Sequence, residues 1–126
     1  MKKLLSVFLL SFLAWLPSWA GNETQPVADL VNRVCGTGAA DHFSFQLNPQ
    51  LSNGKEAFQL GYANGKVTVT GSSLSALSTG LNWYLKHDAH VHISWNNLTE
   101  KPASYPVPKD KQVHASASEF RYYLNY

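Results

Sequence analysis

The sequence has little cysteine and no long hydrophobic run. Cys35 is the only cysteine among 126 residues, which excludes an intrachain disulfide framework and a zinc site built from several thiolates. The one extended apolar stretch, residues 4–16, is too short to be a comfortable transmembrane helix. These absences indicate a small globular domain stabilised by an ordinary hydrophobic core.

Residues 1–20 have the pattern of a secretory signal peptide. Lys2 and Lys3 precede the apolar run, and small residues follow it up to Ala20, after which we expect cleavage. The short leader that opens Met-Lys-Lys is typical of bacteria. We therefore expect an exported protein, periplasmic or extracellular.

Positive charge is also scarce once the leader is removed. The formal charge of +2 comes from Lys2 and Lys3, and residues 21–126 carry eight basic and eight acidic side chains. A neutral chain is not typical of nucleic-acid binding or of binding to an anionic membrane surface. We expect neither nucleic acid nor, after cleavage, a membrane as a partner.

The apolar pattern predicts two helices. Val27, Leu30, Val31 and Val34 share one face of a helix that begins at Pro26. A second helical stripe runs from Leu74 to about Lys86, after serines that suit an N-cap. Gly80 lies inside this stripe, which indicates close packing of the helix on a sheet.

Alternating residues predict the strands 42–47, 57–63, 66–70 and 90–95. Asn64-Gly65 separates the second from the third and is a strong signal for a hairpin. The expected fold class is therefore α/β (α+β), a small mixed sheet of about four strands with two helices packed on it. We expect this domain to span 21–96 and a proline-rich connection to span 97–118.

Few residues suggest chemistry. His90 and His92 would share a strand face near His87, but no third metal ligand is visible, so a polar strand face is the favoured interpretation and we expect no metal or other cofactor. No carboxylate pair lies in an apolar run, and the Gly-x-Ser-x-Gly and phosphate-loop patterns are absent. Trp83 and Trp95 remain as candidates for stacking on a sugar or packing on another domain.

Three segments together resemble the family 89 glycoside hydrolases, the α-N-acetylglucosaminidases. They are Gly80-Leu-Asn-Trp-Tyr-Leu-Lys86, His90-Val-His-Ile-Ser-Trp-Asn96 and Phe120-Arg-Tyr-Tyr-Leu-Asn-Tyr126. The resemblance covers essentially all of 21–126 and matches the N-terminal domain, with 119–126 as the first residues of a truncated catalytic barrel.

The resemblance implies an accessory domain that packs on a (β/α)₈ barrel within an enzyme that removes terminal α-linked N-acetylglucosamine with retention. The two catalytic glutamates of such enzymes belong to the barrel, so this chain would hold no catalytic residue and would be inactive alone. The family pattern places Asn125 near the sugar, but only in an intact parent. Two alternatives stay open: a stand-alone secreted carbohydrate-binding module, and a small metal-binding protein that uses the three histidines.

Overall fold

The computed structural model describes residues 22–118. The leader 1–20, the segment 119–126 and Asn125 therefore lie outside the described residues. The elements, in chain order, are the helix α2 (Gln25–Cys35), the 3₁₀ helix η2 (Ala39–His42), the strands β1 (Phe43–Leu47), β2 (Ala57–Ala63) and β3 (Lys66–Gly71), the helix α3 (Leu74–His87) and the strand β4 (Val113–Ala115). Two helices and a mixed sheet of four strands confirm the predicted α+β class.

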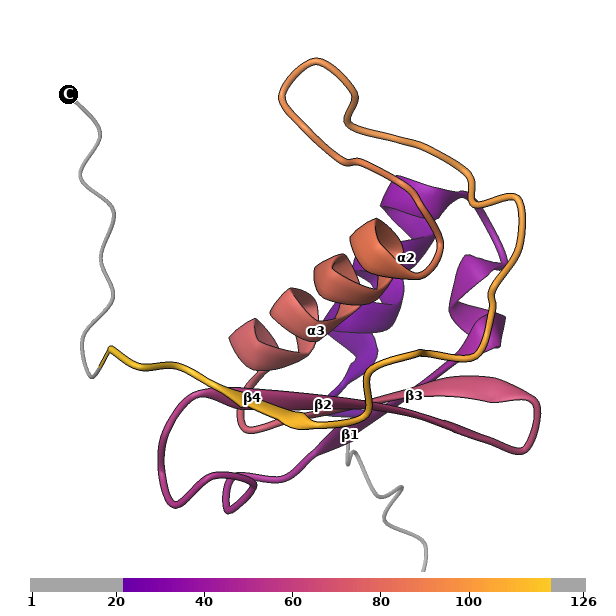
Figure 1. The fold of residues 1–126 in the computed structure, drawn as a ribbon. Coiled ribbons are helices and arrows are strands. Elements are labelled where there is room, and N and C mark those ends of the chain that lie inside the picture. Colours follow the sequence, from indigo (N-terminus) through magenta and orange to yellow (C-terminus); the bar gives the residue numbers. More distant parts are fainter. Residues whose placement is uncertain (1–21, 119–126) are drawn as a thin grey trace, which may run out of the picture.

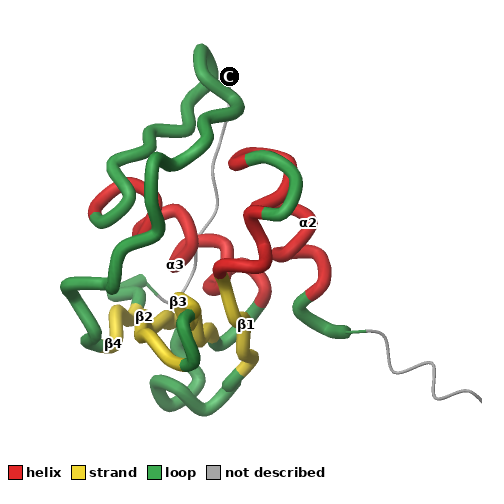
Figure 2. Tube along the Cα trace, turned by 90° about the vertical axis from the view of Figure 1, so that its right-hand side faces the viewer, coloured by secondary structure: helices red, strands yellow, loops and turns green. Residues whose placement is uncertain are grey.

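The domain has two layers. The strand order is β1-β3-β2-β4, with β1 parallel to β3 and the other neighbours antiparallel. Both helices lie over the same face of the sheet, as Figures 1 and 2 show from two sides. Phe43 pairs with Val67 and Leu60 pairs with Val69. All four side chains belong to the core that the strands share with the two helices, so they point to that face.

The predicted hairpin is confirmed. β2 and β3 pair from Phe58–Gly71 to Ala63–Lys66, and the connecting Asn64 and Gly65 have φ values of 52° and 75°. Positive φ at both positions gives the turn a twist that matches the flanking strands. The pairing of β1 with β3 then adds the parallel strand on the far side of β3.

Gly80 lets α3 approach the sheet closely. A Cβ atom added there would lie 2.9 Å from Val69 Cγ1 and 3.1 Å from Phe58 Cβ. Ser73 begins the helix as its N-cap, and its hydroxyl accepts a hydrogen bond of 3.0 Å from the Ala76 N–H. Around this contact the core contains the buried residues Val27, Val31, Cys35, Phe43, Leu60, Val67, Leu77, Leu81, Tyr84 and Leu85.

The prediction of a strand over 90–95 was wrong. The segment is a loop that follows α3, and its one bridge joins Ser94 to Asn97 within the loop itself. The side chain of Val91 is buried in the core, and its N–H donates to the carbonyl of Leu85 at 2.8 Å, which closes the end of α3. The fourth strand is instead β4, which pairs with β2 and was missed inside the proline-rich segment.

The segment 97–118, which we expect to be a proline-rich connection, contains no helix and is attached to the rest of the domain. Pro102 and Pro108 are buried, and the Gln59 side-chain amide donates to the carbonyl of Lys111 at 3.0 Å. Figure 1 shows the chain descending from the loop after α3 along the domain to β4 at the sheet edge. Within residues 22–118, no helix has the length and apolar character needed to span a membrane.

Candidate functional site

Trp83 lies in an aromatic cluster between α3 and β4. Its ring centroid is 4.4 Å from that of His87, 4.8 Å from that of His114 and 5.9 Å from that of Phe58. His114 also stacks on Phe58 at 5.0 Å, so the imidazole from β4 fills the space between strand β2 and the helix. Trp83 therefore packs against rings of its own domain and helps to hold β4 against α3.

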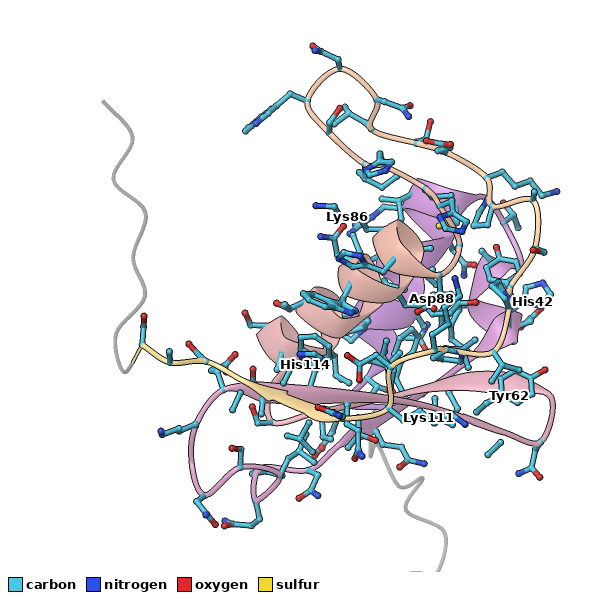
Figure 3. All side chains as sticks on the ribbon, viewed as in Figure 1. His42, Tyr62, Lys86, Asp88, Lys111 and His114 are labelled. Atoms are coloured by element: carbon cyan, nitrogen blue, oxygen red, sulfur yellow. The ribbon has the colours of Figure 1, made fainter. Side chains whose placement is uncertain are left out.

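Asp110 orients the imidazole of His114. Its carboxylate oxygen Oδ2 lies 2.9 Å from His114 Nε2, and its Oδ1 accepts the Gln112 N–H at 2.9 Å. The Gln112 hydrogen bond, and then the His114 contact, lower the pKa of Asp110, although desolvation opposes them. Figure 3 shows His114 on the helix-facing side of the sheet edge. No sequence signal marked this histidine, because it stands alone among small and polar residues in a proline-rich stretch.

The structure does not bring the three predicted histidines together as a metal site. His87 packs on Trp83, and His90 and His92 are exposed in the loop after α3. Among the described residues, no group of three histidine, cysteine, aspartate or glutamate side chains is arranged to hold a metal ion. The shared strand face that would have paired His90 with His92 does not form.

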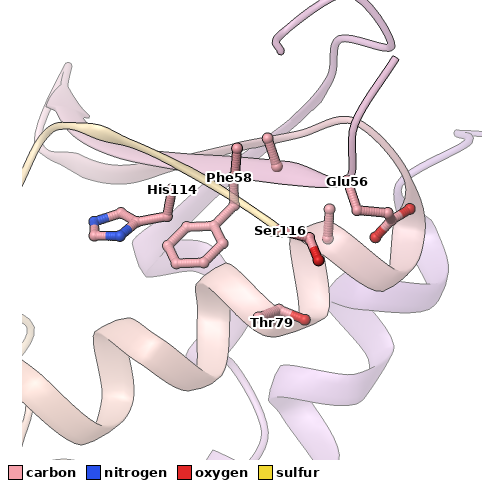
Figure 4. A pocket seen from close by; sticks show the side chains of 8 residues that line it. Glu56, Phe58, Thr79, His114 and Ser116 are labelled. Atoms are coloured by element: carbon pink, nitrogen blue, oxygen red, sulfur yellow. The ribbon is translucent and has the colours of Figure 1, made fainter. Parts of the chain in front are cut away.

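A pocket of about 150 Å³ lies beside this cluster, where β4 meets the start of α3 (Figure 4). Glu56, Phe58, Thr79, His114 and Ser116 contribute to its walls. The volume is below the range of about 300–1,000 Å³ that is usual for small-molecule sites. Its one carboxylate, Glu56, accepts a hydrogen bond from the Ser73 hydroxyl at the start of α3, which gives Glu56 a structural role.

Asp88 is the buried carboxylate of the described region, at 4% exposure. Its Oδ1 accepts the N–H of Lys109 at 3.1 Å. This bond fixes the returning chain, the segment 97–118, against the end of α3. Glycoside hydrolysis uses two carboxyl groups that face each other across a sugar. Glu56 and Asp88 instead accept hydrogen bonds from residues of their own domain, which stabilise the fold.

Cys35 is confirmed as a buried residue of the core rather than an exposed thiol. It is 2% exposed at the end of α2, and burial raises the pKa of its thiol to about 11. The nucleophilic thiolate is therefore scarce at neutral pH.

Trp95 is the other predicted indole, and its surroundings are the opposite of those of Trp83. It is 96% exposed, and Leu98 nearby is 63% exposed. Both belong to the loop after α3, which projects away from the sheet in Figure 1. Of the two indoles, Trp95 alone presents both ring faces to solvent.

A second pocket, of about 400 Å³, lies at the turn end of the hairpin. Tyr62, Lys101, Ser104 and Tyr105 are among its lining residues. The ring of Tyr105 is already stacked on His42, with centroids 4.0 Å apart, and meets the edge of Phe43 at 5.6 Å. The pocket is therefore lined by the rings of Tyr62, His42 and Tyr105, and the last two already stack on each other.

These features define a small α+β domain. In its described part the carboxylates and aromatic rings discussed above mostly stabilise the fold, and Trp95 projects from the loop after α3. A family model described as the α-N-acetylglucosaminidase N-terminal domain matches residues 25–109. The chain belongs to this family.

Relatives agree with this assignment. Human α-N-acetylglucosaminidase is 30% identical over 113 residues, which are 84% of this chain and 15% of that protein. A solved family 89 glycoside hydrolase from Clostridium perfringens, in complex with PUGNAc, has 31% identity and a TM-score of 0.74 over 86% of this chain and 13% of its own. A variant of a Clostridium perfringens enzyme, in complex with its substrate GlcNAc-α-1,4-galactose, has 29% identity and a TM-score of 0.71 over 82% of this chain and 12% of its own.

Proposed function

We propose that this chain serves as the N-terminal accessory domain of a larger, exported α-N-acetylglucosaminidase. The parent would hydrolyse terminal α-linked N-acetylglucosamine with retention of configuration, at a barrel that follows this domain. The observation that supports the proposal is that 86% of this chain matches only 13% of a family 89 glycoside hydrolase, as one domain of a larger enzyme would. The chain spans only about one seventh of the relatives it matches, and the carboxylates described here have structural partners.

Export rests on the leader. Lys2 and Lys3 precede the apolar residues 4–16, and Ala20 precedes the expected cleavage point. N-terminal sequencing of the protein recovered from the periplasm or the medium is expected to begin at Gly21. Recovery of the uncleaved chain from the cytoplasm would contradict export.

The experiment that tests the enzymatic role compares two polypeptides. The 126-residue chain and the longer polypeptide encoded by the reading frame past codon 126 are assayed with an aryl α-N-acetylglucosaminide. We expect turnover by the longer polypeptide alone, with the α-anomer as the first product in NMR spectra. Turnover by the 126-residue chain would contradict the assignment of the active site to a later domain.

A further inference from the structure

The tip of the loop after α3 is a two-residue turn with a tryptophan in it. Ser94 N–H donates to the Asn97 carbonyl at 2.8 Å, and Asn97 N–H donates to the Ser94 carbonyl at 3.1 Å. Trp95 and Asn96 are the residues between them. Neither Trp95 nor Asn96 has a positive φ, and a turn of that conformation accepts most residue types, so it does not require a tryptophan. Trp95 adds nothing to the turn, and its exposed indole is better explained by a contact outside this domain.

The tip is held rigidly by hydrogen bonds at its base. The side-chain amide of Asn97 donates to the Glu100 carboxylate at 2.9 Å and to the His92 carbonyl at 3.3 Å. The N–H of Glu100 donates to the carbonyl of Val34 in α2 at 2.8 Å, which ties the loop to the helix layer. These bonds also occupy the Asn97 amide, so the exposed side chains of Trp95 and Leu98 make up most of the surface that the tip presents to a partner. A rigid apolar tip loses little conformational entropy when it binds.

An apolar groove lies between the helices below this loop. Leu30 and Val34 of α2, Leu81 and Leu85 of α3, and Ile93 of the loop line most of its volume of about 120 Å³. Ile93 is only two residues from Trp95, so it connects the groove to the tip along the chain. The groove and the tip together form what we call the apolar ridge, defined by Leu30, Val34, Ile93, Trp95 and Leu98.

We propose that the apolar ridge is the surface on which the next domain of the same polypeptide docks, with Trp95 as its anchor. This inference rests on the proposed function. The family model spans 25–109, which includes the whole ridge, whereas the relatives are about seven times longer than the part that matches. A parent of that length supplies a neighbouring domain that is covalently attached.

The size of the ridge favours an attached partner over a free one. A tryptophan buries about 150–250 Å², whereas a stable interface between separate proteins buries about 800 Å² on each partner. A ridge of one tryptophan, one exposed leucine and a narrow groove falls short of that area. A tethered domain binds at a high effective concentration, so it can dock on such a surface. A second copy of this chain has no such advantage.

The test uses the longer polypeptide in which this chain is the N-terminal part. Trp95→Ala and Leu98→Ala are compared with Tyr62→Ala and Val107→Ala, which truncate side chains of 42% and 49% exposure outside the ridge. The rate of limited proteolysis between this domain and the next reports how often the two separate. We expect Trp95→Ala to raise that rate about tenfold or more, as for a buried anchor residue, and both control variants to leave it unchanged.

The same substitutions in the 126-residue chain separate docking from folding. Because Trp95 is 96% exposed, its replacement is expected to leave the circular dichroism and thermal unfolding of that chain unchanged. An unchanged proteolysis rate for both ridge variants in the longer polypeptide would overturn the proposal, as would a stop codon directly after Tyr126.

Two further outcomes would also overturn docking and identify the true occupant of the ridge. Saturable quenching of Trp95 fluorescence by N-acetylglucosamine oligosaccharides, lost in Trp95→Ala, would assign Trp95 to a glycan. Dimerisation of the 126-residue chain that Trp95→Ala abolishes would assign the ridge to a second copy. The enzyme assay of the unmodified longer polypeptide is independent of these results: a polypeptide with no hydrolase activity but with faster proteolysis in Trp95→Ala would refute the proposed function and retain the docking surface.

Discussion

The hydroxyl of Tyr84 donates a 2.8 Å hydrogen bond to the main-chain carbonyl of Pro106, from the centre of the helix layer to the returning chain. Tyr84 is fully buried, and burial raises the pKa of its phenol. At the C-cap of α3, Asp88 accepts the N–H of Lys109. These two bonds explain why a polar, proline-rich stretch remains attached to the domain and delivers β4 to the sheet edge.

Tyr84→Phe tests this attachment with little change in volume. The ring contacts with Phe43 remain, but the Pro106 carbonyl loses its donor. We expect the free energy of unfolding to fall by about 1 kcal/mol, the usual contribution of one hydrogen bond, measured by urea unfolding of the 126-residue chain. Tyr62→Phe, at an exposed tyrosine, is the matched control and is expected to have no effect. Equal stability of the two variants would show that the bond contributes nothing.

Gly80→Ala tests the close approach of α3 to the sheet. In an exposed helix this change would stabilise by about 1 kcal/mol. Here the new methyl group would lie 2.9 Å from Val69 Cγ1 and 3.1 Å from two carbons of Phe58, so we expect a net destabilisation of about 1–3 kcal/mol. Ser75→Ala, on the exposed side of α3, is the control and should be neutral or stabilising. A stabilised Gly80→Ala variant in urea unfolding would refute close packing at this point.

Where local chemistry decides the structure, the sequence was sufficient. Asn64 and Gly65 accept the positive φ that the hairpin needs, and Ser73 provides the cap of α3. The apolar stripes then predicted the helices that cover the sheet. In the turn, the cap and the helices, the residues that determine the local structure are the same residues that form the recognisable sequence pattern.

The errors arise where tertiary contacts decide. Val91, Ile93 and Trp95 alternate like a strand, yet each has a different reason for being apolar. Val91 closes the end of α3, Ile93 lines the groove, and Trp95 projects into solvent. β4 was missed because it has only three residues. His114 packs inward because it contacts the rings of Phe58 and Trp83, which lie far from it in the sequence. No local pattern records such contacts between distant parts of the chain.

His90 offers a stability test at the end of α3. It has φ of 57°, a left-handed conformation that asparagine or glycine adopts more readily than histidine. The side chain is exposed, so His90→Asn changes little else. Because histidine is itself tolerated at positive φ, we expect the variant to be more stable by only a fraction of the ~1–2 kcal/mol that this conformation costs an ordinary residue, in thermal or urea unfolding. His92→Asn, at an exposed position without positive φ, should leave stability unchanged, and equal effects at both positions would argue against a conformational cause.

Cys35 gives the domain a predictable response to alkaline pH. Burial raises the pKa of its thiol from 9.0 to about 11, so below pH 9 the thiol is protonated in both the folded and the unfolded chain and contributes no pH dependence. Between pH 9 and about 11 the unfolded chain loses the proton and the folded chain keeps it. The unfolded state then binds fewer protons, so the free energy of unfolding falls as the pH rises, by up to about 1.4 kcal/mol per pH unit.

The measurement is a series of urea unfolding curves from pH 8 to pH 11, recorded for the unmodified chain and for Cys35→Ala. Tyrosines titrate in the same range, and burial also raises the pKa of Tyr84, so only the difference between the two proteins isolates the thiol. We expect the unmodified chain to lose stability relative to Cys35→Ala above pH 9, because the alanine variant has no thiol to ionise on unfolding. Parallel curves would mean that the thiol ionises equally in both states, and therefore that water reaches Cys35 in the folded domain.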